Sequence, residues 1–196
     1  MVAGHTTGCP VQGASSAVTG SWLQDAVWAS SEALHEELAV STVEPLRETE
    51  VSSSMRVGDV YVNVWTSMPN VEQLGVVVSG EQQMPIGYRS LEIIERMDHL
   101  SFQKGVREVL QRHAAEIAGR PAKNIMVIRA GGFAGVVVHG LVGMFNAVGL
   151  KTPVHHDIDT AIVDLLEGDT STMTRATLRP LVEAQIARHL ARVPRR

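Results

Sequence analysis

The sequence is poor in cysteine and in aromatic residues. Its 196 residues include one cysteine, Cys9, which excludes an intrachain disulfide and is typical of a reducing compartment, so we expect a cytoplasmic protein. Aromatic residues make up only 4% of the chain, whereas hydrophobic residues make up 44%. The core must therefore be mainly aliphatic, and it is large enough to exclude a wholly disordered chain.

The sequence also lacks an excess of basic residues. Its formal net charge is −4, whereas a domain that binds nucleic acid usually presents a basic surface. We therefore expect no nucleic acid among its partners.

The sequence contains one long uncharged stretch but no signal peptide, because its first residues show neither a basic start nor a continuous apolar run. Residues 133–150 carry no charged side chain, and this length is close to the minimum for a membrane span. The stretch includes His139, Asn146 and several glycines, and a short strand-like run precedes it. We interpret it as a buried helix and expect no membrane span.

The composition changes along the chain and suggests four segments. Residues 1–20 are rich in Gly, Ser and Thr without apolar periodicity, which is typical of a flexible tail. Residues 21–54 are interpreted as an amphipathic helix followed by a polar linker. Residues 55–168 are expected to form the compact domain, and residues 169–196 an amphipathic C-terminal helix that begins near Pro180.

Within the expected domain, strand and helix patterns alternate. Strands are predicted at residues 60–66, 90–97, 124–129 and 152–156, and helices at 70–83, 101–118, 134–148 and 159–166. The segment 70–83 is ambiguous because it contains three consecutive valines, but Asn70 and Gln73 favour a helix start. The pattern predicts an α/β fold with a four-stranded, largely parallel sheet covered by helices.

Three short motifs resemble those of the SpoIIAA-like, or STAS-like, proteins, which are related to anti-sigma-factor antagonists. They are Tyr61-Val-Asn-Val-Trp65, Ala130-Gly-Gly-Phe133, and Pro153-Val-His-His-Asp157 leading into residues 159–161 and 165–166. The resemblance covers about residues 55–167 and implies a small regulatory α/β domain. Family members often carry a phosphorylatable serine in the turn that here reads 130–133. Because this turn has no hydroxyl residue, we expect no phosphoserine switch.

The glycine-rich turn is the first candidate ligand site. It comprises Gly131, Gly132, Phe133 and Gly135 at the start of a predicted helix, where free backbone N–H groups can bind an anion. The spacing matches neither of the common glycine-rich nucleotide-binding motifs. The alternative is a tight turn that needs the conformational freedom of glycine.

A second candidate site is the run His155, His156 and Asp157, which contains side chains that bind metals. On a strand His155 and Asp157 share one face and His156 lies on the other, so another element would have to complete a metal site. His99, His113 and His139 were considered for that role. The alternative is that Asp157 or Asp159 caps the following helix.

The two ends of the chain differ in charge. Seven acidic residues and one basic residue precede Met55, whereas six arginines and one acidic residue follow residue 170. These ends could pair within one chain or between two chains, or remain separately solvated. The last helix combines an apolar stripe with arginines, and its predicted interface residues are Leu181, Ile186, Arg188, Leu190 and Arg192.

These patterns favour a non-enzymatic protein–protein interaction module in bacterial regulation or assembly. We expect a homo-oligomer with an unidentified protein partner and no cofactor. The alternative is a module that binds a small anion, nucleotide or lipid at residues 131–135. A metal-dependent enzyme using His155, His156 and Asp157 is a third hypothesis.

Overall fold

A computed structural model describes residues 43–96, 105–130, 133–147, 149–168 and 173–193. All of them belong to the compact unit formed by residues 40–196. The expected tail at residues 1–20, the expected helix that begins at Ser21, and Cys9 lie outside the described residues.

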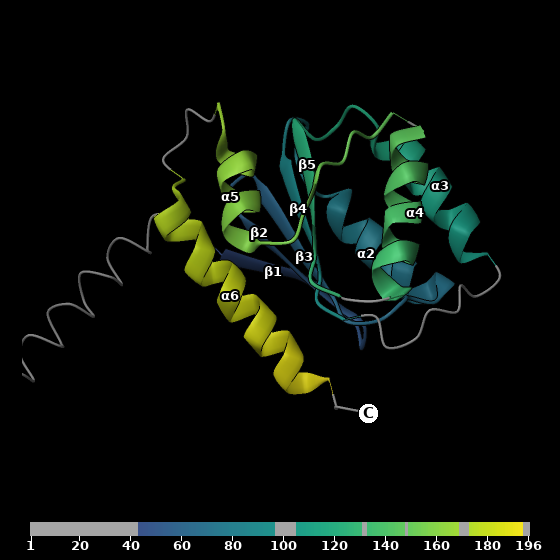
Figure 1. Cartoon of the computed structure of the whole chain (residues 1–196), viewed down its shortest axis with the longest axis horizontal. Coiled ribbons are helices and arrows are strands. Elements are labelled where there is room, and N and C mark those ends of the chain that lie inside the picture. The colour runs from purple at the N-terminus through teal and green to yellow at the C-terminus, as the bar shows by residue number, and fades with distance from the viewer. Residues whose placement is uncertain (1–42, 97–104, 131–132, 148, 169–172, 194–196) are drawn as a thin grey trace, which may run out of the picture. The chain divides into compact units, whose positions relative to one another are not determined.

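The centre of the domain is a six-stranded mixed sheet with the strand order β1-β2-β3-β4-β5-β6 (Figure 1). Its strands are β1 (Val43–Glu48), β2 (Ser52–Val57), β3 (Val60–Trp65), β4 (Arg89–Ile94), β5 (Lys123–Ile128) and β6 (Val154–His155). Strand β2 runs antiparallel to both of its neighbours, β1 and β3. Strands β3 to β6 are parallel, so the four predicted strands do form a parallel group, but the prediction of a four-stranded sheet omitted two strands.

The interpretation of residues 41–54 as a linker is wrong, because β1 and the first half of β2 lie there. Nor does the domain begin at Met55. Ser53 and Ser54 are buried, yet the Ser54 hydroxyl donates to the carbonyl oxygen of Arg47 at 3.2 Å. A buried hydroxyl with a hydrogen-bond partner costs little, so a serine-rich segment can form an interior strand.

The five described helices cover both faces of the sheet (Figure 1). On one face lie α2 (Val71–Glu81), α3 (Val106–Ile117) and α4 (Phe133–Ala147), and on the other lie α5 (Ile158–Leu166) and α6 (Arg175–Arg192). The predicted helices overlap these elements, although residues 101–104 lie outside the described residues. Among the residues described, no helix is long and apolar enough to cross a membrane.

The start of α2 confirms the helical interpretation of residues 70–83. Asn70 is the N-cap, and its side-chain oxygen accepts from the Gln73 backbone N–H at 2.8 Å. The Gln73 side chain accepts from the Asn70 backbone N–H at 3.0 Å. This reciprocal capping box places the ambiguous valine run inside a helix.

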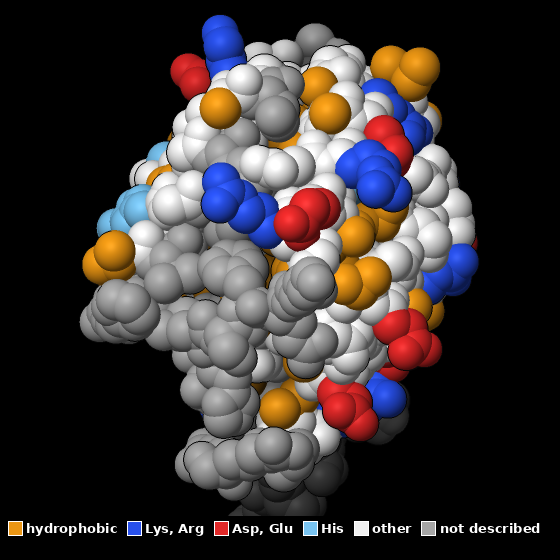
Figure 2. Space-filling model, turned by 90° about the vertical axis from the view of Figure 1, so that its right-hand side faces the viewer, with side chains coloured by type: hydrophobic (Ala, Val, Ile, Leu, Met, Phe, Trp, Pro, Cys, Tyr) orange, Lys and Arg blue, Asp and Glu red, His pale blue; other side chains and the backbone are white. Residues whose placement is uncertain are grey.

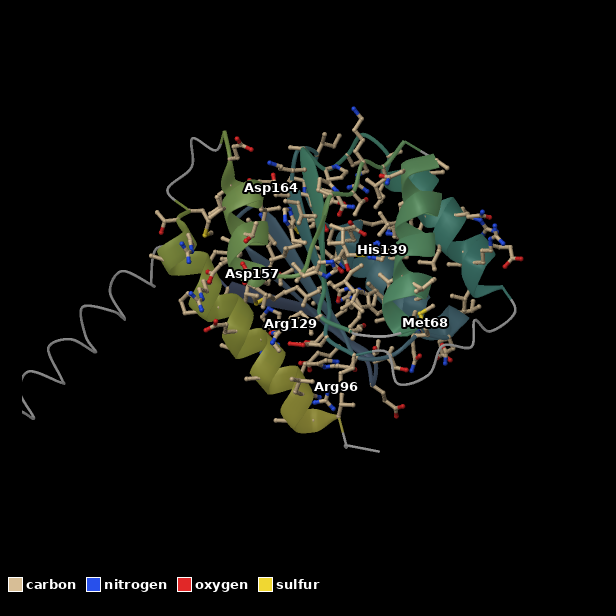
Figure 3. The ribbon with its side chains drawn as sticks, in the orientation of Figure 1. Met68, Arg96, Arg129, His139, Asp157 and Asp164 are labelled. Carbon is tan, nitrogen blue, oxygen red and sulfur yellow. The ribbon has the colours of Figure 1, made fainter. Side chains whose placement is uncertain are left out.

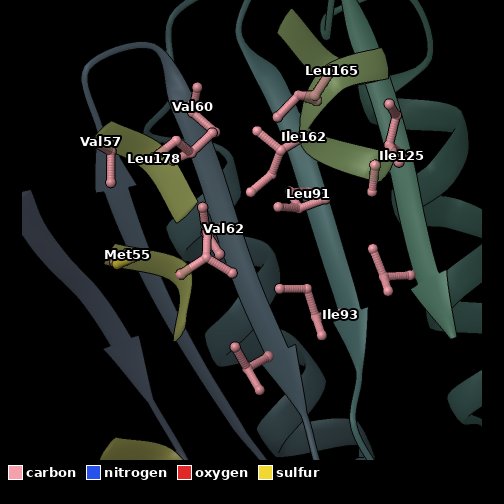
Figure 4. Packing of buried hydrophobic residues seen from close by; sticks show 14 of the residues in the cluster. Met55, Val57, Val60, Val62, Leu91, Ile93, Ile125, Ile162, Leu165 and Leu178 are labelled. Atoms are coloured by element: carbon pink, nitrogen blue, oxygen red, sulfur yellow. The ribbon is translucent and has the colours of Figure 1, made fainter. Parts of the chain in front are cut away.

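The face of the sheet under α5 and α6 is apolar (Figure 4). Val62, Leu91 and Ile93 are fully buried there against side chains of both helices. Those helix side chains are Ile162, Leu165, Leu178, Val182 and Ile186. Burial of one such side chain contributes about 1.5–3 kcal/mol, which makes this layer the main hydrophobic core.

The C-terminal helix belongs to this domain and is not a separate segment. It begins at Arg175, five residues before the predicted start at Pro180, because Thr174 and Thr177 form a capping box. Gln185 is buried and donates to the Ser53 hydroxyl of β2 at 2.6 Å. This hydrogen bond and the burial of its apolar face therefore both hold α6 against the sheet.

Candidate functional site

The opposite face of the sheet carries polar side chains, and they lie beneath α2, α3 and α4. Because side chains alternate along a strand, Asn63 and Trp65 of β3, Glu92 of β4 and Asn124 of β5 share this face. Asn63 and Asn124 are buried. This burial of polar groups contrasts with the apolar layer on the other side of the same strands.

A cavity of about 90 Å³ lies between this polar face and the covering helices. Most of its lining is apolar, with Leu74 from α2, Leu110 from α3 and Phe145 from α4. Four polar or ionisable side chains also line it, namely Glu81, Glu92, His113 and Asn124. An apolar cavity with a few convergent polar groups is the usual form of a small-molecule site.

Glu81, at the end of α2, is the centre of a buried hydrogen-bond network. The Tyr88 hydroxyl donates to its Oε1 at 2.5 Å, and its Oε2 lies 2.7 Å from Nε2 of His113. Glu81 and His113 are only 5% and 8% exposed. Burial beside this carboxylate raises the pKa of the Tyr88 hydroxyl well above its ordinary value, so Tyr88 remains a hydrogen-bond donor at neutral pH.

The two side-chain oxygens of Glu92 differ in their hydrogen bonds. Its Oε2 accepts from Trp65 Nε1 at 2.6 Å and from Asn63 Nδ2 at 3.0 Å. Among the described residues, its Oε1 has only a long contact of 3.4 Å with the Ser90 hydroxyl. Burial, followed by the charge of Glu81, raises the pKa of Glu92 to about 8. Protonation of this carboxyl group is therefore favoured relative to an ordinary glutamate.

Several buried polar atoms at or near the cavity lack partners within the described part of the chain. They include Nδ1 of His113 and Oδ1 of Asn63. Asn124 is 6% exposed, and its Nδ2 donates to the Thr152 hydroxyl at 2.8 Å, whereas its Oδ1 has no hydrogen bond to any described residue. Buried polar atoms are usually hydrogen-bonded in native proteins. Of these residues, His113 and Asn124 line the cavity.

The glycine-rich turn is only partly described. Gly131 and Gly132 lie outside the described residues, and Phe133 and Gly135 belong to the first turn of α4. The anion-binding hypothesis for this turn stays a prediction.

The structure separates the three metal-ligand candidates. His155 Nε2 lies 2.8 Å from Asp164 Oδ2, and His156 Nδ1 lies 3.0 Å from the carbonyl oxygen of Ile128. Asp157 caps α5 by accepting from the Thr160 backbone N–H at 2.7 Å. The alternative function of Asp157 as a helix cap is confirmed.

The other histidines do not complete a metal site with these residues. His139 is exposed on α4, and its ring centre lies 6.2 Å from that of His156 (Figure 3). His113 pairs with Glu81 in the core, and His99 lies outside the described residues. Among the residues that are described, no three His, Cys, Asp or Glu side chains are close enough to hold a metal ion.

The predicted interface residues of α6 are largely engaged within the same chain. Ile186 is buried, and Leu181 and Leu190 pack partly against the main core. Arg188 and Arg192 both form ion pairs with Glu48 of β1. For these arginines the charge pairing between the chain ends is thus intramolecular.

The surface of the face shown in Figure 2 has mixed charge. Lysine and arginine side chains are interspersed with aspartate and glutamate side chains, and neither sign forms a continuous patch among the coloured residues. A nucleic-acid interface would require a basic patch or stripe, and this face does not provide one.

No protein-family model matches this chain, and neither does a curated protein or a solved structure. The STAS-like resemblance therefore stays a prediction. The function must therefore be inferred from the residues of the chain itself.

The sequence patterns did not single out the cavity. Glu92 interrupts the apolar residues Leu91, Ile93 and Ile94 of β4, and this was the available signal. Glu81 was less accessible to prediction because it ends a helix, a common place for a solvated charge. His113 lies in a predicted helix, but its partner Glu81 is 32 positions away in the sequence.

Proposed function

We propose that this domain binds a small molecule in the cavity between β3–β5 and α2–α4. The observation that carries the proposal is a largely apolar cavity whose lining includes the buried residues His113 and Asn124, each with a side-chain atom that has no hydrogen bond to a described residue. A ligand that fills the space removes apolar surface from water and can supply the missing hydrogen bonds.

The size of the cavity limits the ligand. An engineered protein cavity of about 150 Å³ accommodates benzene, and this one measures about 90 Å³. By proportion to that example, the space as it stands suits a ligand of roughly four non-hydrogen atoms.

The structure provides better support for ligand binding in the cavity than for self-association through α6. The self-association hypothesis relied partly on the apolar stripe of α6, and Val182 and Ile186 of this stripe are buried in their own domain. Their apolar surface therefore contributes to folding and is not free to drive association with a second copy.

Filling the cavity with protein atoms should abolish binding. Ala114 of α3 is fully buried and lines the cavity, so Ala114→Val places two extra methyl groups beside the space. We expect small probes such as isobutanol to shift the methyl NMR signals of Leu74, Ile94 and Met126 in the wild type. The same probes should cause little or no shift in the variant.

Ala161→Val is the matched control. Ala161 is also fully buried, but it belongs to the apolar core under α5, so the substitution strains the fold without entering the cavity. This variant should retain the probe-induced shifts. Shifts that are absent from the wild type, or that survive unchanged in Ala114→Val, would refute binding in this cavity.

A further inference from the structure

We propose that the cavity selects a small aliphatic primary amine, bound as its ammonium ion, with Glu92 as the counter-ion. This inference rests on the proposed binding function and adds the chemical class of the ligand. It follows from the charge and hydrogen-bond character of the groups that line the cavity.

The ionisable groups of the cavity wall disfavour an anion. The described lining contains two carboxyl groups, Glu81 and Glu92, and one histidine, but neither lysine nor arginine. No lysine or arginine among the described lining residues could pair with a carboxylate or phosphate ligand, whereas an ammonium ion can pair with the Glu92 carboxylate. This argues against an anionic ligand at this site.

The side-chain oxygens at the cavity that lack a good hydrogen-bond partner are acceptors, so the ligand must supply a donor. Both oxygens of Glu81 are already engaged, by Tyr88 and by His113. The Oε1 atom of Glu92 has only its 3.4 Å contact with Ser90, and the side-chain oxygen of Asn124 has no partner among the described residues.

An ammonium group suits these two acceptors, because it carries N–H donors and no acceptor. The two acceptors come from neighbouring parallel strands, since Asn124 is in register with Ser90, two residues before Glu92 on the same face. The apolar remainder of the lining suits an aliphatic body. A small alkylamine combines both features.

Binding should release a proton from Glu92. The titratable groups around Glu92 are Glu81 from α2, His113 from α3, Tyr61 from β3 and Tyr88 at the start of β4. The side chains of α4 and the following loop that line the cavity, Phe145 and Leu150, do not titrate. The ammonium ion replaces the carboxyl proton, which passes to the solvent, so one positive charge enters and one proton leaves.

The test is an NMR titration of the full-length protein with three probes of similar shape, namely isobutylamine, isobutanol and isobutyrate. We expect isobutylamine to bind most tightly at pH 7 and isobutyrate most weakly. The affinity for isobutylamine should rise by up to about tenfold per pH unit from pH 6 to 8 and then level off, while that for isobutanol stays constant. Calorimetry in buffers of different ionisation enthalpy should detect the released proton.

Two variants separate the role of Glu92 from a general effect of charge. Glu92→Gln keeps the shape of the side chain but cannot ionise, and it should weaken isobutylamine binding by at least about tenfold while changing isobutanol binding less than about twofold. Glu72→Gln alters an exposed residue of α2 and should change neither. Thermal melting verifies that both variants are folded.

The outcomes distinguish this inference from the binding function on which it rests. If isobutanol binds as tightly as isobutylamine, or if Glu92→Gln weakens both equally, the ligand class is wrong and the binding function stands. Tightest binding of isobutyrate would also overturn the class. If no probe shifts the signals of the cavity residues, both proposals fail.

Discussion

At the scale of single residues, Glu92 determines how the stability of the fold depends on pH. Its pKa is raised from an ordinary value of 4.5 to about 8 in the folded state. The folded state therefore holds the proton more tightly than the unfolded state, and the protonated group favours folding fully below about pH 4.5. This contribution is lost as the pH rises through about 8.

Glu92→Gln should remove this pH dependence. Between pH 5 and 8 the unfolding free energy of the wild type should fall relative to that of the variant, by up to about 1.4 kcal/mol per pH unit. Urea denaturation at several pH values measures the difference, with Glu72→Gln as the control. Parallel pH curves for the wild type and Glu92→Gln would show that the burial of Glu92 carries no such penalty.

The buried hydrogen bond between Glu81 and His113 leads to a second prediction at this scale. His113→Ala leaves the buried Glu81 carboxylate without one of its two partners, and breaking a buried pair typically costs about 3–5 kcal/mol. His139→Ala removes an exposed histidine of α4 and should cost less than about 0.5 kcal/mol. Equal losses of unfolding free energy in the two variants would contradict the importance of the pair.

At the scale of elements, α6 has a pH-sensitive contact with the sheet. His189 is buried, and its Nε2 lies 3.2 Å from the Thr66 hydroxyl. Burial lowers the pKa of His189, although Glu48 on β1 favours its charged form and Arg188 and Arg192 disfavour it. The neutral form therefore stabilises the docked helix, and this stabilisation is lost as the pH falls below the ordinary histidine pKa of 6.5.

We predict that α6 opens more readily in acid. Hydrogen exchange of the α6 backbone amides, corrected for intrinsic rates, should show less protection at pH 5 than at pH 7.5. The loss should be much smaller in His189→Gln, whose side chain does not titrate, and unchanged in the control His139→Gln. The idea would be abandoned if His189→Gln lost protection in acid to the same extent as the wild type.

Elements with local signals could be predicted from the sequence, and those stabilised by distant partners could not. The helix start at Asn70 and the helix end before Gly119, which has a left-handed φ of +80°, follow from nearby residues. Strand β2 was missed because its serines resemble a linker. The Ser53 hydroxyl is satisfied by Gln185, 132 residues away, and no local pattern records such a partner.

At the scale of the whole molecule, the sheet has two different faces. One is an aliphatic core under α5 and α6, and the other is a partly polar layer with a cavity under α2, α3 and α4. The alternating apolar residues predicted the α/β class and the parallel strands β3 to β6. The cavity could not be predicted, because Glu81, Glu92, His113 and Asn124 come together only after four separate elements have packed.

The most direct test of the central claim is a crystal structure of the full-length protein soaked with isobutylamine. The account predicts electron density for one molecule in the cavity, with its nitrogen within hydrogen-bond distance of Glu92 Oε1 and its carbons against Leu74 and Leu110. An unoccupied cavity at a saturating concentration, or a molecule bound only elsewhere, would contradict it.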